Sequence, residues 1–250
     1  MIPLLRGWTA VQRTAQSNLH LGVTLCFVAG ATNAGGFLAV GQYTSHMTGM
    51  LSSVADNLVT GQIYLALAAV MSLLAFLGGA MTSAWMVNWA LRRKLQSAYG
   101  RPLLLEAVLL LLFGLFGSGI SFFAVLFVPL TVLVLCFIMG LQNAVITKIS
   151  HAEIRTTHVT GLVTDLGIEL GKLLYINRLT RDTLVHANRQ KLSLLAKLIS
   201  SFFIGGLVGA IGFKQVGFIT TVPLAILLLL LVWHPVLNDA RHWIDPQHRP

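Results

Sequence analysis

Charged residues are scarce in this 250-residue chain, and acidic residues are the scarcest of them. Only 10% of the residues are charged and only 8 are Asp or Glu, whereas 56% are hydrophobic and the mean hydropathy is +0.79. A soluble domain carries about 25% charged residues. The composition therefore excludes a soluble domain and predicts an integral membrane protein whose main partner is the lipid bilayer.

Sequence motifs of enzymes and of cofactor-binding proteins are also absent. The sequence has no H-E-x-x-H, no G-x-S-x-G, no Walker loop and no Cys-x-x-Cys pair. Its two cysteines, Cys26 and Cys136, lie inside apolar runs, where we expect buried packing thiols rather than redox chemistry. The sequence predicts no metal site and no cofactor.

Six apolar runs are each long enough to cross a bilayer. A helix needs about 20 apolar residues to span roughly 30 Å of hydrocarbon, and the strands of a barrel would instead be short and alternating. We therefore expect residues 1–250 to form one all-α membrane domain with six transmembrane helices, near residues 19–41, 64–87, 103–125, 127–147, 195–213 and 216–234.

The two halves of the chain repeat each other at polar and glycine positions. Three stretches of the first half recur in the same order in the second half: "CFVAGATNA" (26–34) as "CFIMGLQNA" (136–144), "HMTG" (46–49) as "HVTG" (158–161), and "FLGG" (76–79) as "FIGG" (203–206). The glycine pairs predict close helix contacts. The matches predict two repeats, residues 19–125 and 127–234, with short tails.

Lysine and arginine residues gather on one side of the predicted spans. They precede the first span and fill the loops at residues 92–101 and 148–191, while the opposite loops contain only Lys214. The positive-inside rule then places these loops and both termini in the cytoplasm, which accounts for the net charge of +9 without nucleic acid. Because each repeat has three spans, the second repeat is expected to be inverted, as in many secondary transporters.

Each His-x-Thr-Gly tetrad lies near the start of a segment that is not a convincing full span, at residues 42–62 and 151–172. We predict two short re-entrant or interfacial helices, one approaching from each face and together lining one polar site. At a helix start a Thr hydroxyl can cap N–H groups, Gly allows close approach, and free N–H groups attract anions. The tetrad residues predicted to bind substrate are His46, Thr48, Gly49, His158, Thr160 and Gly161.

Two alternatives stay open for these tetrads. The Thr–Gly pairs could simply cap and pack the helices without a ligand. The histidines could form a proton relay or anchor the chain at the membrane interface.

Each repeat also places an asparagine within its first span, Asn33 and Asn143. A buried amide either bonds to a neighbouring helix or coordinates a solute, so both residues are candidates for substrate binding. Gly35 and Gly36 are expected to loosen the first span just beyond Asn33 and to expose carbonyl groups.

Three acidic residues in the short segments are candidates for coupling or relay: Asp56, Asp165 and Glu169. Ionisable residues at membrane depth usually face a cavity or a partner. Glu169 could instead form an ordinary ion pair with Lys172, and Asp165 would be solvated if its segment lies on the membrane surface. Glu106 is expected at the interface, beside Arg101.

The stretches "GATNAGGFLAVGQYTSHMTGMLSSVADNLVTG" and "GLQNAVITKI", the latter followed by "IRTTHVTGLVTDLGIELGK", resemble the YoaK or DUF1275 family of small bacterial membrane proteins. The resemblance implies six spans and a bacterial inner membrane. This chain has Asn33 where the family often has Asp, and Met50 where it often has Asn. If relatives bind a cation or proton at those positions, the resemblance implies different coupling, or none, in this chain.

The leading hypothesis is a secondary transporter or permease for a small, possibly anionic, solute bound between the two repeats. One alternative is an intramembrane enzyme that uses His46, His158 and Asp165 as acid–base groups. Another is a non-catalytic membrane assembly or stress protein, in which the glycine pairs would be oligomer contacts.

Overall fold

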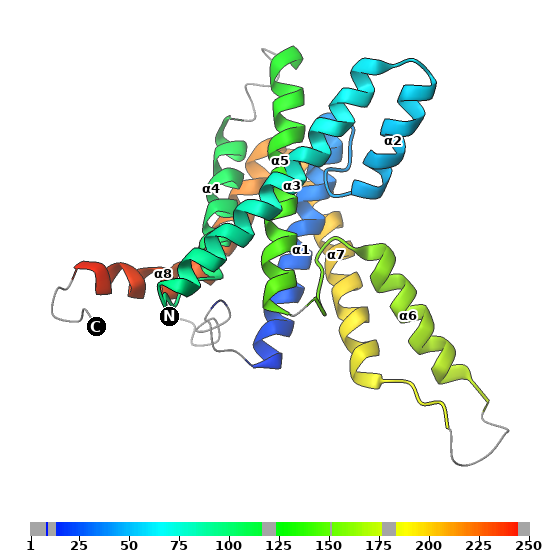
Figure 1. Cartoon of the computed structure of the whole chain (residues 1–250), viewed down its shortest axis with the longest axis vertical. Helices are drawn as coiled ribbons and strands as arrows, with labels where there is room; N and C mark the ends of the chain where they lie inside the picture. Colours follow the sequence, from blue (N-terminus) through cyan, green and yellow to red (C-terminus); the bar gives the residue numbers. More distant parts are fainter. Residues whose placement is uncertain (1–8, 10–13, 117–123, 151, 177–183, 245–250) are drawn as a thin grey trace.

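The computed structural model describes residues 9, 14–116, 124–150, 152–176 and 184–244. Within these residues the regular structure is helical (Figure 1), in the order α1 (Ala15–Val40), α2 (Met47–Val59), α3 (Ile63–Arg92), α4 (Gly100–Phe116), α5 (Ala124–Ile149), α6 (Val159–Leu174), α7 (Arg189–Val216), the 3-10 helix η4 (Gly217–Thr220) and α8 (Thr221–Ile244).

Four stretches of the described chain are long and apolar enough to cross a membrane: Gln16–Val40, Ile63–Arg92, Val128–Ile149 and Arg189–Asp239. The last of these contains both α7 and α8. The prediction of an all-α membrane protein is therefore confirmed. Helix α4 has 17 residues, and residues 117–123 of the predicted span 103–125 lie outside the described residues.

Several helices begin before the apolar runs that predicted them. Helix α7 starts at Arg189, because the side chain of Asn188 accepts a hydrogen bond from the backbone N–H of Lys191. Helix α1 starts at Ala15, after Thr14 caps it in the same way. Hydropathy marks the part of a helix suited to lipid, whereas the capping residue marks where the helix begins.

The long helices pair across the two halves of the chain. Helix α1 packs along α7, and α3 packs along α5, and these are the two most extensive helix contacts. Helix α2 packs on α3 and α6 packs on α7, while α4 pairs with α8. Figure 1 shows α2 beside α3 and α6 beside α7 at opposite ends of the long helices. The first long helix of each half, α1 or α5, therefore packs on the second long helix of the other half, α7 or α3.

Glycines allow these long helices to touch through their backbones. A β-carbon at Gly79 would lie 2.0 Å from the carbonyl oxygen of Phe137 in α5, and one at Gly205 would lie 2.1 Å from that of Phe27 in α1. Neither position can carry a larger residue without separating the helices. The predicted helix-contact role is confirmed for both glycines.

Gly35 and Gly36 do not loosen the first span, and that expectation is wrong. Helix α1 continues through both residues and ends at Gly41, which has a positive φ of 72°. A β-carbon at Gly35 would lie 2.1 Å from Cε2 of Phe213, so this glycine makes room for an aromatic ring. Close packing, rather than backbone opening, accounts for it.

Buried side chains of α1, α4, α5, α7 and α8 form one apolar core. Cys26 and Cys136 are both fully buried free thiols. The prediction that they are packing thiols is therefore confirmed. The Sγ atom of Cys26 lies 3.7 Å from the backbone carbonyl of Thr156, just ahead of the second tetrad.

Candidate functional site

Both tetrads lie at helix starts, but their threonines do not cap. The N-cap residues of α2 and α6 are His46 and His158, and neither side chain makes a capping hydrogen bond. Thr48 and Thr160 occupy the second helical position, too late to cap, and their hydroxyls have no hydrogen-bond partner within the described residues. The capping prediction is wrong, and both hydroxyls are free to meet a ligand.

The tetrad glycines make room for the histidine rings. A β-carbon at Gly49 would lie 2.1 Å from Cδ2 of His46, and one at Gly161 would lie 2.4 Å from both Cε1 and Nδ1 of His158. Each ring therefore folds back over the first turn of its own helix. This close approach explains why glycine follows the histidine three residues later in both tetrads.

The asparagines of α1 and α5 hold the residues that precede the tetrads. The Asn33 amide oxygen accepts hydrogen bonds from the backbone N–H of Ser45 at 3.1 Å and from its hydroxyl at 2.9 Å. The Asn143 amide oxygen accepts from the Thr156 hydroxyl at 3.1 Å and from the Thr157 N–H at 3.3 Å, and its amide nitrogen donates to the Thr157 hydroxyl. Both amide oxygens are thus engaged by the chain itself.

One cleft of about 530 Å³ brings the two tetrads together. Its polar lining comes from Ser45, His46, Thr48, Asn143, Thr147, Lys148, Arg155, Thr157, His158 and Thr160, and its apolar lining from Met47, Phe76, Ala80, Ala84, Gly140 and Ala144. Of the predicted binding residues, Asn33, Gly49 and Gly161 do not line it. Figure 1 shows α2 and α6 running in opposite directions away from this region.

The described lining of the cleft is basic and holds no carboxylate. Lys148 donates a hydrogen bond to the side-chain oxygen of Asn88, and Arg155 makes no ion pair with a described residue. The first turns of α2 and α6 add free N–H groups, which carry partial positive charge. Together these groups favour an anion. From the sequence, Lys148 and Arg155 are assigned to the basic loops that set the topology and not to the site, although Arg155 lies only three residues before His158.

The family model described as "Protein of unknown function (DUF1275)" matches residues 21–234, which include the whole cleft. The chain belongs to the DUF1275 family. A curated relative of this DUF1275 protein is the UPF0700 transmembrane protein YoaK of Bacillus subtilis (strain 168), which is 28% identical over 173 residues, covering 65% of this chain and 73% of the relative. No solved structure matches the chain. The resemblance found in the sequence is confirmed.

None of the three candidate coupling acids of this DUF1275 protein lines the cleft. Asp56 is exposed on α2, and Asp165 lies 3.4 Å from the Nζ of Lys191. Glu169 pairs with Lys172 at 2.8 Å and accepts the N–H of Asn188 at 2.7 Å, so the ion pair left open as the alternative to a coupling role is present. The Lys172 hydrogen bond, followed by the Asn188 N–H, lowers the pKa of Glu169.

A second hollow of about 470 Å³ lies beside the start of α6 in this DUF1275 protein. It shares Arg155, His158 and Thr160 with the cleft and also contains Asp165, but not His46. Neither of these two hollows is therefore lined, among the described residues, by all three residues of the intramembrane-enzyme alternative.

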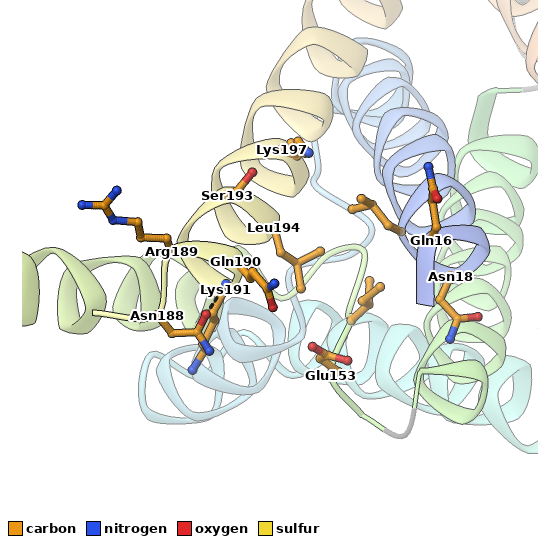
Figure 2. Close-up of a pocket in the computed structure, with 12 residues that line it drawn as sticks. Gln16, Asn18, Glu153, Asn188, Arg189, Gln190, Lys191, Ser193, Leu194 and Lys197 are labelled. Atoms are coloured by element: carbon orange, nitrogen blue, oxygen red, sulfur yellow. Dashed lines mark hydrogen bonds between the residues drawn. The ribbon is translucent and has the colours of Figure 1, made fainter. Parts of the chain in front are cut away.

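A larger pocket of about 670 Å³ lies between the starts of α1 and α7 (Figure 2). Figure 2 shows Leu194 and Glu153 facing it and the Arg189 side chain pointing away from the other labelled residues. No tetrad residue lines this pocket. The tetrad cleft is accordingly the candidate site of the DUF1275 protein.

Proposed function

We propose that this DUF1275 protein is a secondary transporter or permease for a small anion, which binds in the tetrad cleft. One observation carries the proposal: a single cleft takes side chains from both tetrads, adds Lys148 and Arg155, and has no acidic side chain in its described lining. A volume of about 530 Å³ suits a small solute with part of its hydration shell.

The cleft belongs, in this proposal, to one membrane domain with six spans in two inverted repeats, residues 19–125 and 127–234. Three features support the inversion. The α1–α7 contact corresponds to the α5–α3 contact, the α2–α3 contact corresponds to α6–α7, and the two short helices point in opposite directions. A site between inverted repeats can open to either face by rocking of one repeat against the other.

Orientation follows from the basic loops in the same proposal. Both termini and the loops at residues 92–101 and 148–191 face the cytoplasm of a bacterial inner membrane. Helix α2 then enters from the outside and α6 from the inside, as short re-entrant helices. Their free N–H groups meet at the bound anion, which lowers the energy of placing its charge within the membrane.

The test is anion flux into liposomes that contain the purified protein. The probes are nitrate, formate, acetate, bicarbonate, inorganic phosphate and sulfate, each with a proton gradient and with a sodium gradient. We expect the wild type to carry at least one of them. Absence of flux for all six, with correctly inserted and folded protein, would contradict the proposal.

Matched threonine variants connect that flux to the cleft. Replacing Thr48 and Thr160 together by Val removes two hydroxyls that have no partner within the described residues, so stability should change by less than about 0.5 kcal/mol. We expect flux to be lost. The control is Thr24→Val, whose hydroxyl donates to the His20 carbonyl outside the cleft. Equal flux in the double variant and the control would show that the transported anion does not bind in the cleft.

A further inference from the structure

Glu106 is buried, and the expectation that it lies at the membrane interface is wrong. Glu106 lies on α4 and has 0% of its surface exposed. Gln142, on α5, is also 0% exposed. The Gln142 amide nitrogen donates to Oε1 of Glu106 at 3.0 Å. Glu106 lies about 1.7 turns after the first residue of α4, and its burial is decided by the direction in which it points, toward Gln142 of α5.

This pair is missing one hydrogen donor. The other carboxyl oxygen, Oε2 of Glu106, and the amide oxygen of Gln142 are both buried without a hydrogen-bond partner among the described residues. A carboxylic acid and a primary amide can pair reciprocally, with the amide N–H donating to one carboxyl oxygen and the acid O–H donating to the amide oxygen. The first bond is present, and a proton on Oε2 would supply the donor for the second.

Among the described residues, no opposite charge pairs with Glu106 in place of that proton. Its neighbours one turn away on α4, Leu103 and Leu110, belong to the apolar core. Besides Glu106, the titratable side chains described on α4 and on the helices packed against it are Tyr64 and Arg92 of α3, Arg101 of α4, Cys136 and Lys148 of α5, and His234 and Asp239 of α8.

Two of these groups, Asp239 and Lys148, have hydrogen-bond partners elsewhere. Asp239 accepts hydrogen bonds from Ser97 and Gln96, and Lys148 donates to Asn88. None forms an ion pair with Glu106. A bare carboxylate in such surroundings is costly, so the carboxyl group favours a bound proton.

The helix packing itself does not require this polar pair. Thr32 takes the place of Gln142 in the matching stretch of α1, and it is also buried, at 1% exposure. One half of the chain thus builds the same helix position without a long amide.

Gln142 connects the carboxyl group to the cleft. The next residue on α5, Asn143, lines the cleft and holds Thr156 and Thr157 in front of the second tetrad. Consecutive helical residues point about 100° apart, so Gln142 faces α4 while Asn143 faces the cleft. Movement of α5 against α4 therefore moves one wall of the cleft.

We propose that Glu106 is a proton-binding site that couples a proton gradient to anion movement, a role that rests on the proposed transport function. A proton from water forms the O–H bond on Oε2 and bridges to the Gln142 amide oxygen. Release of that proton to water leaves acceptors facing each other, and the repulsion shifts α5 relative to α4. The cleft then changes shape with each cycle of protonation.

The first test observes the proton directly and needs no solute. Infrared difference spectra compare the wild type in lipid with Glu106→Gln, whose amide can still pair with Gln142. We expect a protonated-carboxyl carbonyl band at neutral pH that is absent in Glu106→Gln, unchanged in the exposed-carboxyl control Glu153→Gln, and shifted in Gln142→Met. An ionised Glu106 at neutral pH, or a band that persists at every pH where the protein stays folded, would overturn the proposal.

The second test measures coupling, with nitrate, formate and inorganic phosphate as probes in proteoliposomes. We expect Glu106→Gln to carry anion down its own gradient at a rate that an inward proton gradient does not change, while the wild type accelerates several-fold. An equal response in both proteins would overturn the coupling role. Absence of anion flux in both proteins would refute the coupling role together with the transport function, whereas an infrared failure with normal flux would refute the proton site alone.

Discussion

Replacing Gly161 by Ala should leave the stability of the protein nearly unchanged and yet impair its transport. The new β-carbon would lie 2.4 Å from the His158 ring, against about 3.5–4.0 Å for an ordinary carbon–carbon contact. The ring must therefore move by about 1 Å or more. Because it is a side chain it can rotate, at a cost of about 0.5–1.5 kcal/mol for a strained rotamer.

Alanine also favours the helix. It stabilises a helix position by about 1 kcal/mol relative to glycine, which offsets the rotamer cost. The net change in unfolding free energy should then lie within about 0.5 kcal/mol of zero, from these two terms. Anion flux should fall, because the His158 ring leaves the position from which it lines the cleft.

Gly167→Ala on the same helix is the matched control. Gly167 faces open space, so its alanine gains the helix preference of about 1 kcal/mol without any collision. Thermal unfolding followed by circular dichroism in detergent, together with liposome flux, measures both effects. If Gly161→Ala stabilises the protein as much as Gly167→Ala and transports at the wild-type rate, the argument about the ring is wrong.

Three further predictions concern the loops and charges around the cleft. Asn143→Leu should destabilise the protein more than Asn33→Leu in chemical denaturation, because it removes three hydrogen bonds to the following loop rather than two, at about 1 kcal/mol each. Lys148→Gln should raise the KM for anion uptake about tenfold or more, and the control Arg189→Gln should not. Ionised Glu169 has a pKa below its ordinary value, so its stabilisation is complete above the ordinary value and is lost as pH falls through the lowered one. Glu169→Gln should therefore flatten the acid side of a curve of Tm against pH. An unchanged curve would show that ionised Glu169 does not stabilise the protein.

The helices and the two short segments could be predicted from the sequence because their signals are local. Apolar runs set the long helices, and the tetrads mark the starts of α2 and α6 to within a residue or two. The matched glycines also carried information, since only a close helix crossing explains Gly79 and Gly205. These features depend on neighbouring residues, or on a repeat that is visible in the chain.

The orientation of single side chains could not be predicted in the same way. Glu106 looked interfacial because Arg101 is near in sequence, but its side chain faces Gln142, which is 36 residues away. Thr48 was expected to cap α2 because the sequence does not fix the N-cap to the residue. The N-cap is His46, two residues before Thr48. Arg155 lines the cleft only because the chain folds back between α5 and α6. Each case depends on tertiary contacts that no local pattern contains.

Protection of two engineered thiols by one anion tests the shared cleft most directly. Thr48→Cys and Thr160→Cys are made separately, since the native Cys26 and Cys136 are fully buried and should react slowly with a water-soluble maleimide. We expect a transported anion to slow labelling at both positions with the same half-saturating concentration, because both line one binding site. Protection of only one position, or half-saturating concentrations that differ tenfold, would contradict a single site shared by the two tetrads.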